Sequence, residues 1–291
     1  MQIAIIGSNG QIGTEVVRAA KAAGLDAIEL RHSDCDVTDG ASVARALAPL
    51  RSGDVVVNTA AFHNTDECED AGDRALSVNA LGAYRVAAEA RKQGATAVHL
   101  SSDFVFDGAK RTPYVESDKP NPLNLYGVSK LTGEALLRTA NPNHYLIRVS
   151  AVFGPAGSSG KSGNFVESMV AKARKGETPD VVDDIVMAPT SAADASGLLV
   201  QLLQRKAPFG TYHLANAGEC SWLEFTDEIF ELIGANIRAR PIKASTLNGK
   251  AQRPLYSVLA SERIMPLGLE ARDWREGLRD YLQGKGYLNR S

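Results

Sequence analysis

A tyrosine and a lysine stand four positions apart in the stretch LYGVSK, residues 125–130. In a helix this spacing places the side chains of Tyr126 and Lys130 on one face. A free phenol has a pKa of about 10 and is a poor proton donor or acceptor at neutral pH. An ammonium group held beside it stabilises the phenolate and lowers that pKa. The pair therefore suggests acid–base chemistry, although a surface pair on a helix is equally typical of this spacing taken alone.

A serine at the end of a strand-like run gives the pair a third partner. Ser102 closes the run 96–102, and the stretch that carries Tyr126 follows it along the chain. Its hydroxyl would donate a hydrogen bond to a carbonyl oxygen beside the phenol, and Lys130 would also hold the ribose of a nicotinamide cofactor. Ser102, Tyr126 and Lys130 are therefore candidate catalytic residues for hydride transfer to a ketone, with Tyr126 as proton donor. For Ser102 alone, satisfying the backbone at a strand end is the alternative.

A glycine-rich turn at the N-terminus is typical of a dinucleotide site. The apolar run 3–6 predicts a buried strand, apolar residues at helical spacing lead from Ile12 to Ala20, and Gly24 ends the helix. Glycines let the backbone approach a pyrophosphate, and the helix N-terminus supplies amide donors. The GxxGxxG spacing is the short-chain dehydrogenase variant. The expected cofactor contacts here are Gly7, Asn9, Gly10, Gln11, Ile12 and Gly13. A plain turn without cofactor is the alternative.

The end of the second predicted strand, residues 27–30, bears on the choice of cofactor. NAD-binding chains place an acid near this point to hold the ribose 2′-hydroxyl. Here Arg31 follows the strand, and its guanidinium could pair with a 2′-phosphate. Glu29 is a less well placed acid, and Arg31 could also be a solvated loop charge. The sequence favours NADPH and leaves NADH open.

Strand-like runs at 54–60, 96–102 and 144–150 alternate with helical stretches. This alternation predicts an α/β fold with a doubly wound, Rossmann-type parallel sheet, which binds ligands beyond the carboxyl ends of its strands. We expect a dinucleotide-binding domain at 1–153 and a smaller, mainly substrate-binding domain at 154–291, with about 185–217 returning to the first. The glycine- and serine-rich stretch 154–164 suggests a lid or crossover loop, 225–234 an amphipathic helix, and 244–254 a loop.

Composition excludes several classes of function. The net charge of −2 argues against a protein that binds nucleic acid by bulk charge. The three cysteines lack CxxC spacing, which favours a reducing compartment, and no apolar run reaches the roughly 18 residues that a membrane span needs. The five histidines show no paired-ligand spacing, so no metal site is expected. We expect a cytoplasmic protein with a small-molecule substrate and no nucleic-acid or membrane partner.

Several stretches together resemble one family. They are GSNGQIG (7–13), SSDFVFDG (101–108), YGVSK (126–130), GNFVESM (163–169), VVDDIVMAPTSA (181–192), GTYHLANAGECSWLEF (210–225) and RPLYSVL (253–259). They are similar to the extended short-chain dehydrogenases, and within them to the dTDP-4-dehydrorhamnose reductases, over nearly the whole chain. The resemblance implies the catalytic set Ser102, Tyr126 and Lys130. It implies cofactor contacts at Gly10, Gln11, Ile12, Asp36, Val37, Ala60, Ala61 and Phe62, to which we add Asn79, and places Asp103 beside the substrate.

Two departures from the family pattern concern the sugar. The reductases carry a tryptophan after the fifth strand, where this chain has Ala151, and a tyrosine after the serine–aspartate pair, where it has Phe104. Neither change touches the hydride chemistry, but both leave the identity of the sugar open. The expected substrate contacts are Ser102, Asp103, Phe104, Ala151, Asn164 and Arg253. Arg253 suits a pyrophosphate, with an interdomain salt bridge as its alternative.

The resemblance implies reduction of a 4-keto-6-deoxy nucleotide sugar, dTDP-4-dehydrorhamnose to dTDP-rhamnose, with a homodimer as one expected assembly. Phe104 argues against a dehydratase, because the dehydratases that resemble this chain carry a glutamate at that position. An epimerase remains open, since it needs little beyond the tyrosine and bound NAD. A regulatory subunit without turnover, such as those of methionine adenosyltransferase, is the alternative from another class, and it does not explain why Ser102, Tyr126 and Lys130 are all present.

Overall fold

A parallel sheet forms the centre of the molecule. The computed structural model describes residues 1–156 and 163–288, so most of the glycine- and serine-rich stretch 154–164 lies outside the described residues. The strand order is β10-β5-β4-β3-β1-β2, and every neighbouring pair is parallel. The strands are β1 (Gln2–Ile6), β2 (Asp26–Leu30), β3 (Val55–Asn58), β4 (Thr96–Ser102), β5 (His144–Val149) and β10 (Gly210–His213). The predicted Rossmann-type sheet is therefore confirmed.

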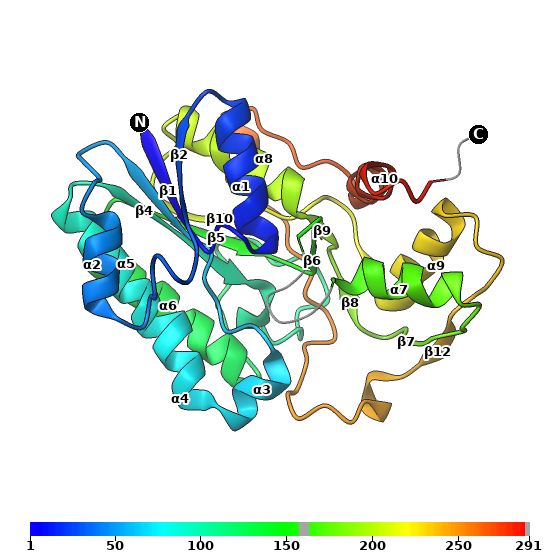
Figure 1. Cartoon of the computed structure of the whole chain (residues 1–291). Coiled ribbons are helices and arrows are strands. Elements are labelled where there is room, and N and C mark those ends of the chain that lie inside the picture. The colour runs from blue at the N-terminus through cyan, green and yellow to red at the C-terminus, as the bar shows by residue number, and fades with distance from the viewer. Residues whose placement is uncertain (157–162, 289–291) are drawn as a thin grey trace.

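Alternation along the strands fills one core on each face of the sheet (Figure 1). Ile3 and Ile5 face helices α1 (Gln11–Ala22) and α8 (Ala192–Gln204), whereas Ala4 and Ile6 face the opposite side. That side is covered by α2 (Gly40–Leu47), α5 (Gly82–Lys92) and α6 (Leu125–Ala140). Because both faces are covered, the central strands β1 and β3 are apolar in nearly all of their residues.

The connection after β3 is built from short helices that lead into α5. They are α3 (Thr65–Asp70), α4 (Gly72–Ala75) and the π-helical turn η1 (Leu76–Leu81). A further short turn, η2 (Asp103–Val105), follows β4 directly. Since π-helical turns are rare and often occur at functional sites, η1 suggests that this connection contributes to a functional site.

The C-terminal part packs around its own apolar cluster. Helices α7 (Phe165–Arg174), α9 (Trp222–Leu232) and α10 (Trp274–Gly284) enclose Trp274, which is fully buried. Short strands pair beside them: β7 (Asp180–Val182) with β12 (Arg240–Ile242), β8 (Val186–Met187) with β11 (Cys220–Ser221), and β6 (Val152–Phe153) with β9 (Thr190–Ser191). Turns η3 (Ala244–Thr246) and η4 (Met265–Leu267) lie in the connections. Between these elements the chain returns to the sheet through α8 and β10.

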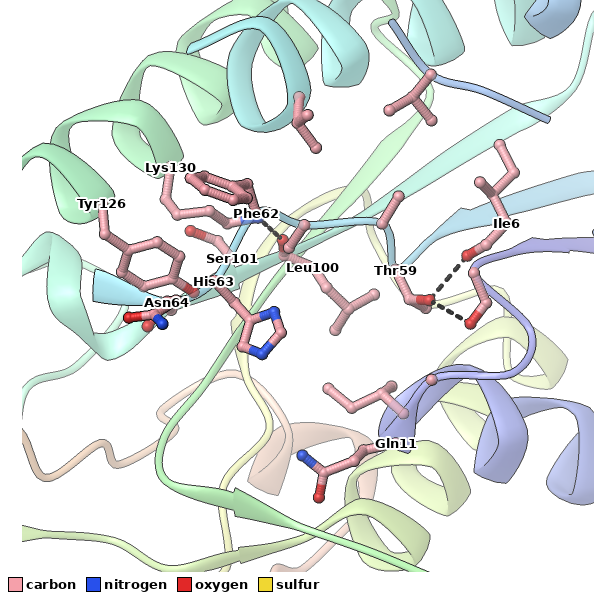
Figure 2. Close-up of a pocket in the computed structure, with 18 of the residues that line it drawn as sticks. Ile6, Gln11, Thr59, Phe62, His63, Asn64, Leu100, Ser101, Tyr126 and Lys130 are labelled. Atoms are coloured by element: carbon pink, nitrogen blue, oxygen red, sulfur yellow. Dashed lines mark hydrogen bonds between the residues drawn. The ribbon is translucent and has the colours of Figure 1, made fainter. Parts of the chain in front are cut away.

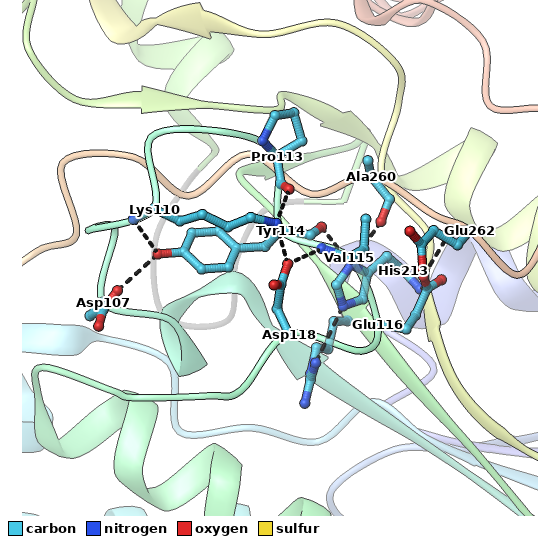
Figure 3. Close-up of polar contacts among 11 residues, drawn as sticks. Asp107, Lys110, Pro113, Tyr114, Val115, Glu116, Asp118, His213, Ala260 and Glu262 are labelled. Carbon is cyan, nitrogen blue, oxygen red and sulfur yellow. Dashed lines mark hydrogen bonds and ion pairs between the residues drawn. The ribbon is translucent and has the colours of Figure 1, made fainter.

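A polar junction ties the sheet edge at β10 to two distant segments (Figure 3). The Glu116 carboxylate accepts hydrogen bonds from the backbone amides of His213, at 3.0 Å, and Glu262, at 2.9 Å. The Nδ1 of His213 lies 3.1 Å from the Tyr114 carbonyl and 2.9 Å from the Ala260 carbonyl, so it donates to both. Burial lowers the pKa of His213 to about 4 against the attraction of Glu116, so the imidazole is neutral in the folded protein.

This junction predicts acid sensitivity of the fold. In the unfolded chain His213 takes up a proton near its ordinary pKa of about 6.5, whereas the folded imidazole resists protonation down to about 4. Stability is therefore lost as pH falls through this window, by on the order of 3 kcal/mol. The depressed pKa of Glu116 adds its own loss at lower pH, below about 4.5. Replacing His213→Asn keeps an N–H donor and should flatten urea-unfolding stability between pH 6.5 and 4. The same pH slope in wild type and variant would contradict this account.

Candidate active site

A cavity of about 1190 Å³ opens at the carboxyl ends of the central strands. Figure 2 shows Tyr126 and Lys130 on one side of it and Gln11 on another. Its wall includes most of the residues expected from the sequence: Gly7, Asn9, Gly10, Gln11, Ile12, Asp36, Val37, Ala60, Ala61, Phe62, Ser102, Asp103, Phe104, Tyr126, Lys130 and Ala151. The fold thus brings residues from six separate stretches of the chain to one place, where doubly wound sheets bind ligands.

The glycine turn is held close to the neighbouring strands. A side chain at Gly7, whose φ is +77°, would lie 2.6 Å from Thr59 Oγ1, and one at Gly13 would lie 2.1 Å from the Gly7 carbonyl. The amides of Gly7 and Ser8 donate to the Leu30 carbonyl at 2.8 and 3.2 Å. Gly13 is therefore a packing position behind the turn and does not line the cavity.

The N-terminus of α1 is open toward the cavity. Its N-cap residue, Gly10, offers no side-chain hydrogen bond, so the first amides of the helix keep their donor capacity. Gln11, at the first helical position, has an Oε1 atom that is buried without a hydrogen-bond partner among the described residues. Free amides and a positive dipole end are what a pyrophosphate requires. These residues therefore fit a dinucleotide.

The end of β2 differs in detail from the expectation. His32 lines the cavity, whereas Arg31 does not, and its side chain is exposed. Glu29 pairs with Lys21 at 2.7 Å on the surface. Asp36 lines the cavity and accepts hydrogen bonds from the amide and hydroxyl of Thr38, at 2.8 and 2.7 Å, which lower its pKa. The expected contact of Arg31 is therefore not part of the cavity wall.

Asn79 does not line the cavity but holds Phe62, which does. Its amide accepts from the Phe62 amide at 2.8 Å and donates to the Phe62 carbonyl at 2.9 Å and to Ser129 Oγ at 2.9 Å. Asn79 is fully buried in η1 and is not part of the cavity surface. It therefore links the loop after β3 to α6 and shapes the cofactor side of the cavity from outside.

The tyrosine and the lysine occupy the first two turns of α6. The N-cap Asn124 accepts a hydrogen bond from the Gly127 amide at 2.8 Å and so fixes the start of this helix. Lys130 is fully buried, and its ammonium donates to the Leu100 carbonyl at 2.5 Å (Figure 2). Burial lowers the pKa of Lys130 to about 8, and the carboxylate of Glu134 opposes that shift.

The pKa of the Tyr126 phenol is raised, contrary to the expectation that Lys130 lowers it. Desolvation is the main cause and the charge of Asp103 adds to it, while hydrogen bonding with Ser102 opposes it. The ammonium of Lys130 is drawn to the Leu100 carbonyl, on the strand side of α6. Tyr126 therefore carries its proton at neutral pH, as a free phenol also does, and its burial by itself makes it a weaker acid.

A polar stripe beneath α6 supports the lysine. His99, Ser101 and Arg148 project from β4 and β5 toward this helix. Arg148 binds both oxygens of Glu134, at 2.7 and 2.8 Å, and Ser101 Oγ donates to the same carboxylate at 2.7 Å. His99 Nε2 lies 3.5 Å from Lys130 Nζ, and the pKa of His99 lies well below its ordinary value because of burial and the lysine charge. Such a fully paired buried network fixes α6 in one position.

The substrate side of the cavity is lined by Ser102, Asp103, Phe104 and Ala151. The ring of Phe104 contacts that of Tyr126 edge-on, with centroids 5.7 Å apart. Ala151 has a φ of +40°, in the left-handed region that side chains rarely adopt. Backbone outliers of this kind concentrate at functional sites, and this one lies beside the candidate catalytic residues.

Two expected substrate contacts are engaged elsewhere. Asn164 is the N-cap of α7, where its Oδ1 accepts from the Glu167 amide at 3.1 Å and its Nδ2 donates to the Gly154 carbonyl at 2.7 Å. Arg253 forms an ion pair with Asp66 of α3, at 2.8 Å, which is the salt bridge weighed as its alternative. Neither residue lines the cavity.

Several cavity residues were not predicted from the sequence. They are His32, Cys35, Thr38, Thr59, His63, Asn64, Thr65, Glu67, Asp73, Arg74, Ser77 and Val78, together with neighbouring apolar residues. His63 and Asn64 directly continue the predicted stretch 60–62, so extending that stretch would have included them. Arg74 lies over the Phe62 ring, 4.7 Å from its centroid, a contact that no local pattern indicates.

Within residues 1–156 and 163–288, no group of three or more acidic, histidine or cysteine side chains could hold a metal ion. In the same ranges, no helix combines the length and apolar character needed to cross a membrane.

The fold and the cavity together define a dinucleotide-binding α/β protein of the short-chain dehydrogenase type. Residues 1–286 match the family model described as the RmlD substrate binding domain, and the chain belongs to this family. The resemblance seen in the sequence is thereby confirmed.

Relatives are similar over almost the entire chain. The chain is 38% identical over 282 residues to the spore coat polysaccharide biosynthesis protein SpsK of Bacillus subtilis, with 97% of each covered. It is 37% identical over 282 residues to a dTDP-4-dehydrorhamnose reductase of Mycolicibacterium smegmatis, covering 96% of this chain and 84% of that one. The crystal structure of dTDP-4-dehydrorhamnose reductase from Bacillus anthracis in complex with NADP matches with a TM-score of 0.91 and 30% identity, covering 97% and 99%. The similarity therefore includes the C-terminal part as well as the sheet.

The closeness of α6 to its neighbours yields a stability prediction. A Cβ atom at Gly133 would lie 2.3 Å from the Asn79 carbonyl, whereas one at Gly197 of α8 would meet nothing within 4 Å. Gly133→Ala should lower the free energy of unfolding by about 1–3 kcal/mol through overpacking. The matched variant Gly197→Ala should raise it by up to about 1 kcal/mol through helix propensity. Urea unfolding of both variants measures the difference, and equal effects at the two positions would contradict the close packing of α6.

Proposed function

We propose that the protein reduces the keto group of a 4-keto-6-deoxy nucleotide sugar, dTDP-4-dehydrorhamnose in the first instance, with NADPH as hydride donor. One observation carries the proposal: Ser102, Tyr126 and Lys130 lie on the wall of the same cavity as the glycine turn. The names of the relatives in Mycolicibacterium smegmatis and Bacillus anthracis support the reaction and the substrate class.

The cofactor side is built for a dinucleotide. The open N-terminus of α1 would take the pyrophosphate, and the small residues Ala60 and Ala61 would allow a close approach along the end of β3. When bound, NADPH supplies the hydride. Arg31 is the proposed partner of the 2′-phosphate, with the neighbouring cavity residue His32 as its rival. NADH is the alternative cofactor.

The proton comes from the phenol of Tyr126. As the carbonyl carbon of the sugar receives the hydride, its oxygen gains negative charge and takes the Tyr126 proton. The phenol carries this proton at neutral pH, and the negative charge that develops on the carbonyl oxygen draws the proton across. The Lys130 ammonium would hold the cofactor ribose and stabilise the resulting phenolate, and Ser102 would donate a hydrogen bond to the same carbonyl oxygen.

Substrate binding is assigned to the space beside Asp103, Phe104 and Ala151. The dTDP-4-dehydrorhamnose reductases carry a tryptophan at the position of Ala151, and this smaller residue would leave room for a sugar ring. Residues 1–153 are proposed as the dinucleotide-binding domain and 154–291 as the mainly substrate-binding domain, with about 185–217 returning to the sheet. Asn164 and Arg253 would reach the nucleotide only if their contacts within the protein open.

A homodimer and a cytoplasmic location complete the proposal. Leu76 and Leu81 of η1 and Val128 of the neighbouring α6 are exposed apolar side chains that a second copy could cover. Cys35, Cys68 and Cys220 are buried and free, as is usual in a reducing compartment.

The test is turnover by a variant that lacks only the phenolic hydroxyl. Tyr126→Phe should lower kcat for NADPH oxidation with dTDP-4-dehydrorhamnose by roughly 10²–10⁴-fold, because the proton donor is lost. Its NADPH dissociation constant should remain near that of wild type. The control is Tyr84→Phe, an exposed tyrosine of α5, which should keep full activity. Near-wild-type turnover by Tyr126→Phe, or no NADPH oxidation by wild type with any 4-keto-6-deoxy nucleotide sugar, would overturn the proposal.

A further inference from the structure

The carboxylate of Asp103 receives three serine hydroxyls from separate parts of the chain. Ser102 Oγ donates to its Oδ1 at 2.9 Å, and Ser150 and Ser257 donate to its Oδ2 at 2.9 and 2.6 Å. All four residues are buried. Ser102 ends β4, Ser150 follows β5, and Ser257 belongs to the C-terminal stretch 253–259. The cluster therefore joins the catalytic edge of the sheet to the C-terminal part.

The single hydroxyl proton of Ser102 already forms the hydrogen bond to Asp103. The Ser102 oxygen accepts a hydrogen bond from the Phe104 amide at 3.2 Å and is hydrogen-bonded with the Tyr126 phenol, while its proton points to Asp103. In this arrangement Ser102 has no proton to offer to a substrate carbonyl. Donation to the substrate requires that the hydroxyl turn away from Asp103, so the strength of the Ser102–Asp103 hydrogen bond decides whether Ser102 can act.

Ser150 and Ser257 determine the strength of the hydrogen bond between Ser102 and Asp103. A carboxylate that shares its charge among several donors holds each of them less tightly, and hydrogen bonds to the charged form stabilise it. If the hydroxyl of Ser150 or Ser257 were removed, the buried Asp103 carboxylate would bind the Ser102 hydroxyl more strongly. Burial makes this exchange consequential, since no bulk water replaces a lost donor.

The position of Ser257 is fixed by its backbone. Its amide donates to the Val186 carbonyl at 2.9 Å, and the Val186 amide donates to the Leu255 carbonyl at 3.0 Å. A side chain at Gly108 would come within 3.0 Å of the amides of Leu255 and Tyr256, so this stretch packs directly on the loop that follows η2. These backbone contacts therefore hold the side chain of Ser257 next to the Asp103 carboxylate.

We propose that Ser257 and Ser150 are positioning residues that act through Asp103 to leave the Ser102 hydroxyl free to turn toward the substrate carbonyl. This inference rests on the proposed reduction of a keto sugar. It also gives Asp103 a role in positioning Ser102, because hydroxyl donors engage both of its oxygens.

The kinetic test separates positioning from general support of the fold. Ser257→Ala should lower kcat by roughly tenfold, a fraction of the 10²–10³-fold loss typical of removing a transition-state donor outright, with KM little changed. Ser257→Thr, which retains a hydroxyl, should recover most of the loss. In a Ser102→Ala background, adding Ser257→Ala should change kcat no further, because the residue through which it acts is gone. Ser150→Ala should behave as Ser257→Ala does and covers the case in which a Ser257 variant fails to fold.

The matched control removes a similar bond elsewhere. The hydroxyl of Ser261, which lies just beyond the stretch 253–259, donates to the Glu116 carboxylate, away from the cavity wall. Ser261→Ala should lower thermal stability while leaving kcat and KM unchanged. The inference is overturned if Ser257→Ala and Ser150→Ala leave kcat unchanged, or if their effect is equally large in the Ser102→Ala background.

A second measurement does not depend on turnover. Burial raises the pKa of Asp103, and hydrogen bonds from Ser257, Ser102 and Ser150 oppose that rise; the titratable neighbour that senses its charge is Tyr126. Carboxyl ¹³C NMR titration, with the signal assigned through Asp103→Asn, should show this pKa moving up in Ser257→Ala and Ser150→Ala but not in Ser261→Ala. An unmoved signal would overturn the inference even if wild type proved inactive on keto sugars. Absence of wild-type turnover would by itself overturn only the proposed function.

Discussion

The close approach of α6 to the end of β4 is the constraint on which the site depends. A Cβ atom at Gly127 would lie 2.2 Å from the Phe104 carbonyl, and one at Gly133 would lie 2.3 Å from the Asn79 carbonyl. Glycine at 127 lets the helix lie this near the turn that follows β4, and glycine at 133 lets it lie equally close to η1. That contact brings the phenol of Tyr126 to the rim of the sheet and buries the ammonium of Lys130 against the Leu100 carbonyl.

Desolvation then sets the electrostatics of the site. It raises the pKa of Tyr126, lowers that of Lys130 to about 8, and raises that of Asp103, each against the effect of a specific partner. The partner of the lysine, Glu134, lies one turn further along α6, whereas Ser257, a partner of the aspartate, comes from a distant part of the chain. The pKa shifts of Tyr126, Lys130 and Asp103 are therefore properties of the folded assembly around α6, and the tyrosine–lysine spacing alone does not determine them.

Local sequence patterns predicted the features that depend on neighbouring residues, namely strands and turns. The apolar run 96–102 coincides with β4, and the glycine turn lies where its spacing places it. Partners far apart in sequence were beyond such patterns. Arg253 meets Asp66, 187 residues away, and Ser257 meets Asp103, 154 residues away, because the C-terminal stretch folds back onto the sheet edge. Asn164 shows another limit, since an amide that suits a nucleotide also suits the N-cap it forms.

The central claim is that this cavity transfers a hydride to the carbonyl carbon of a keto sugar. The most direct measurement uses NADPH deuterated at the transferred position of its nicotinamide, with dTDP-4-dehydrorhamnose as substrate and mass and NMR analysis of the sugar product. The account predicts one deuterium per product molecule, located at C4, with an equal amount of NADP⁺ formed. A product without deuterium, or a sugar whose configuration changes without net oxidation of the cofactor, would contradict it.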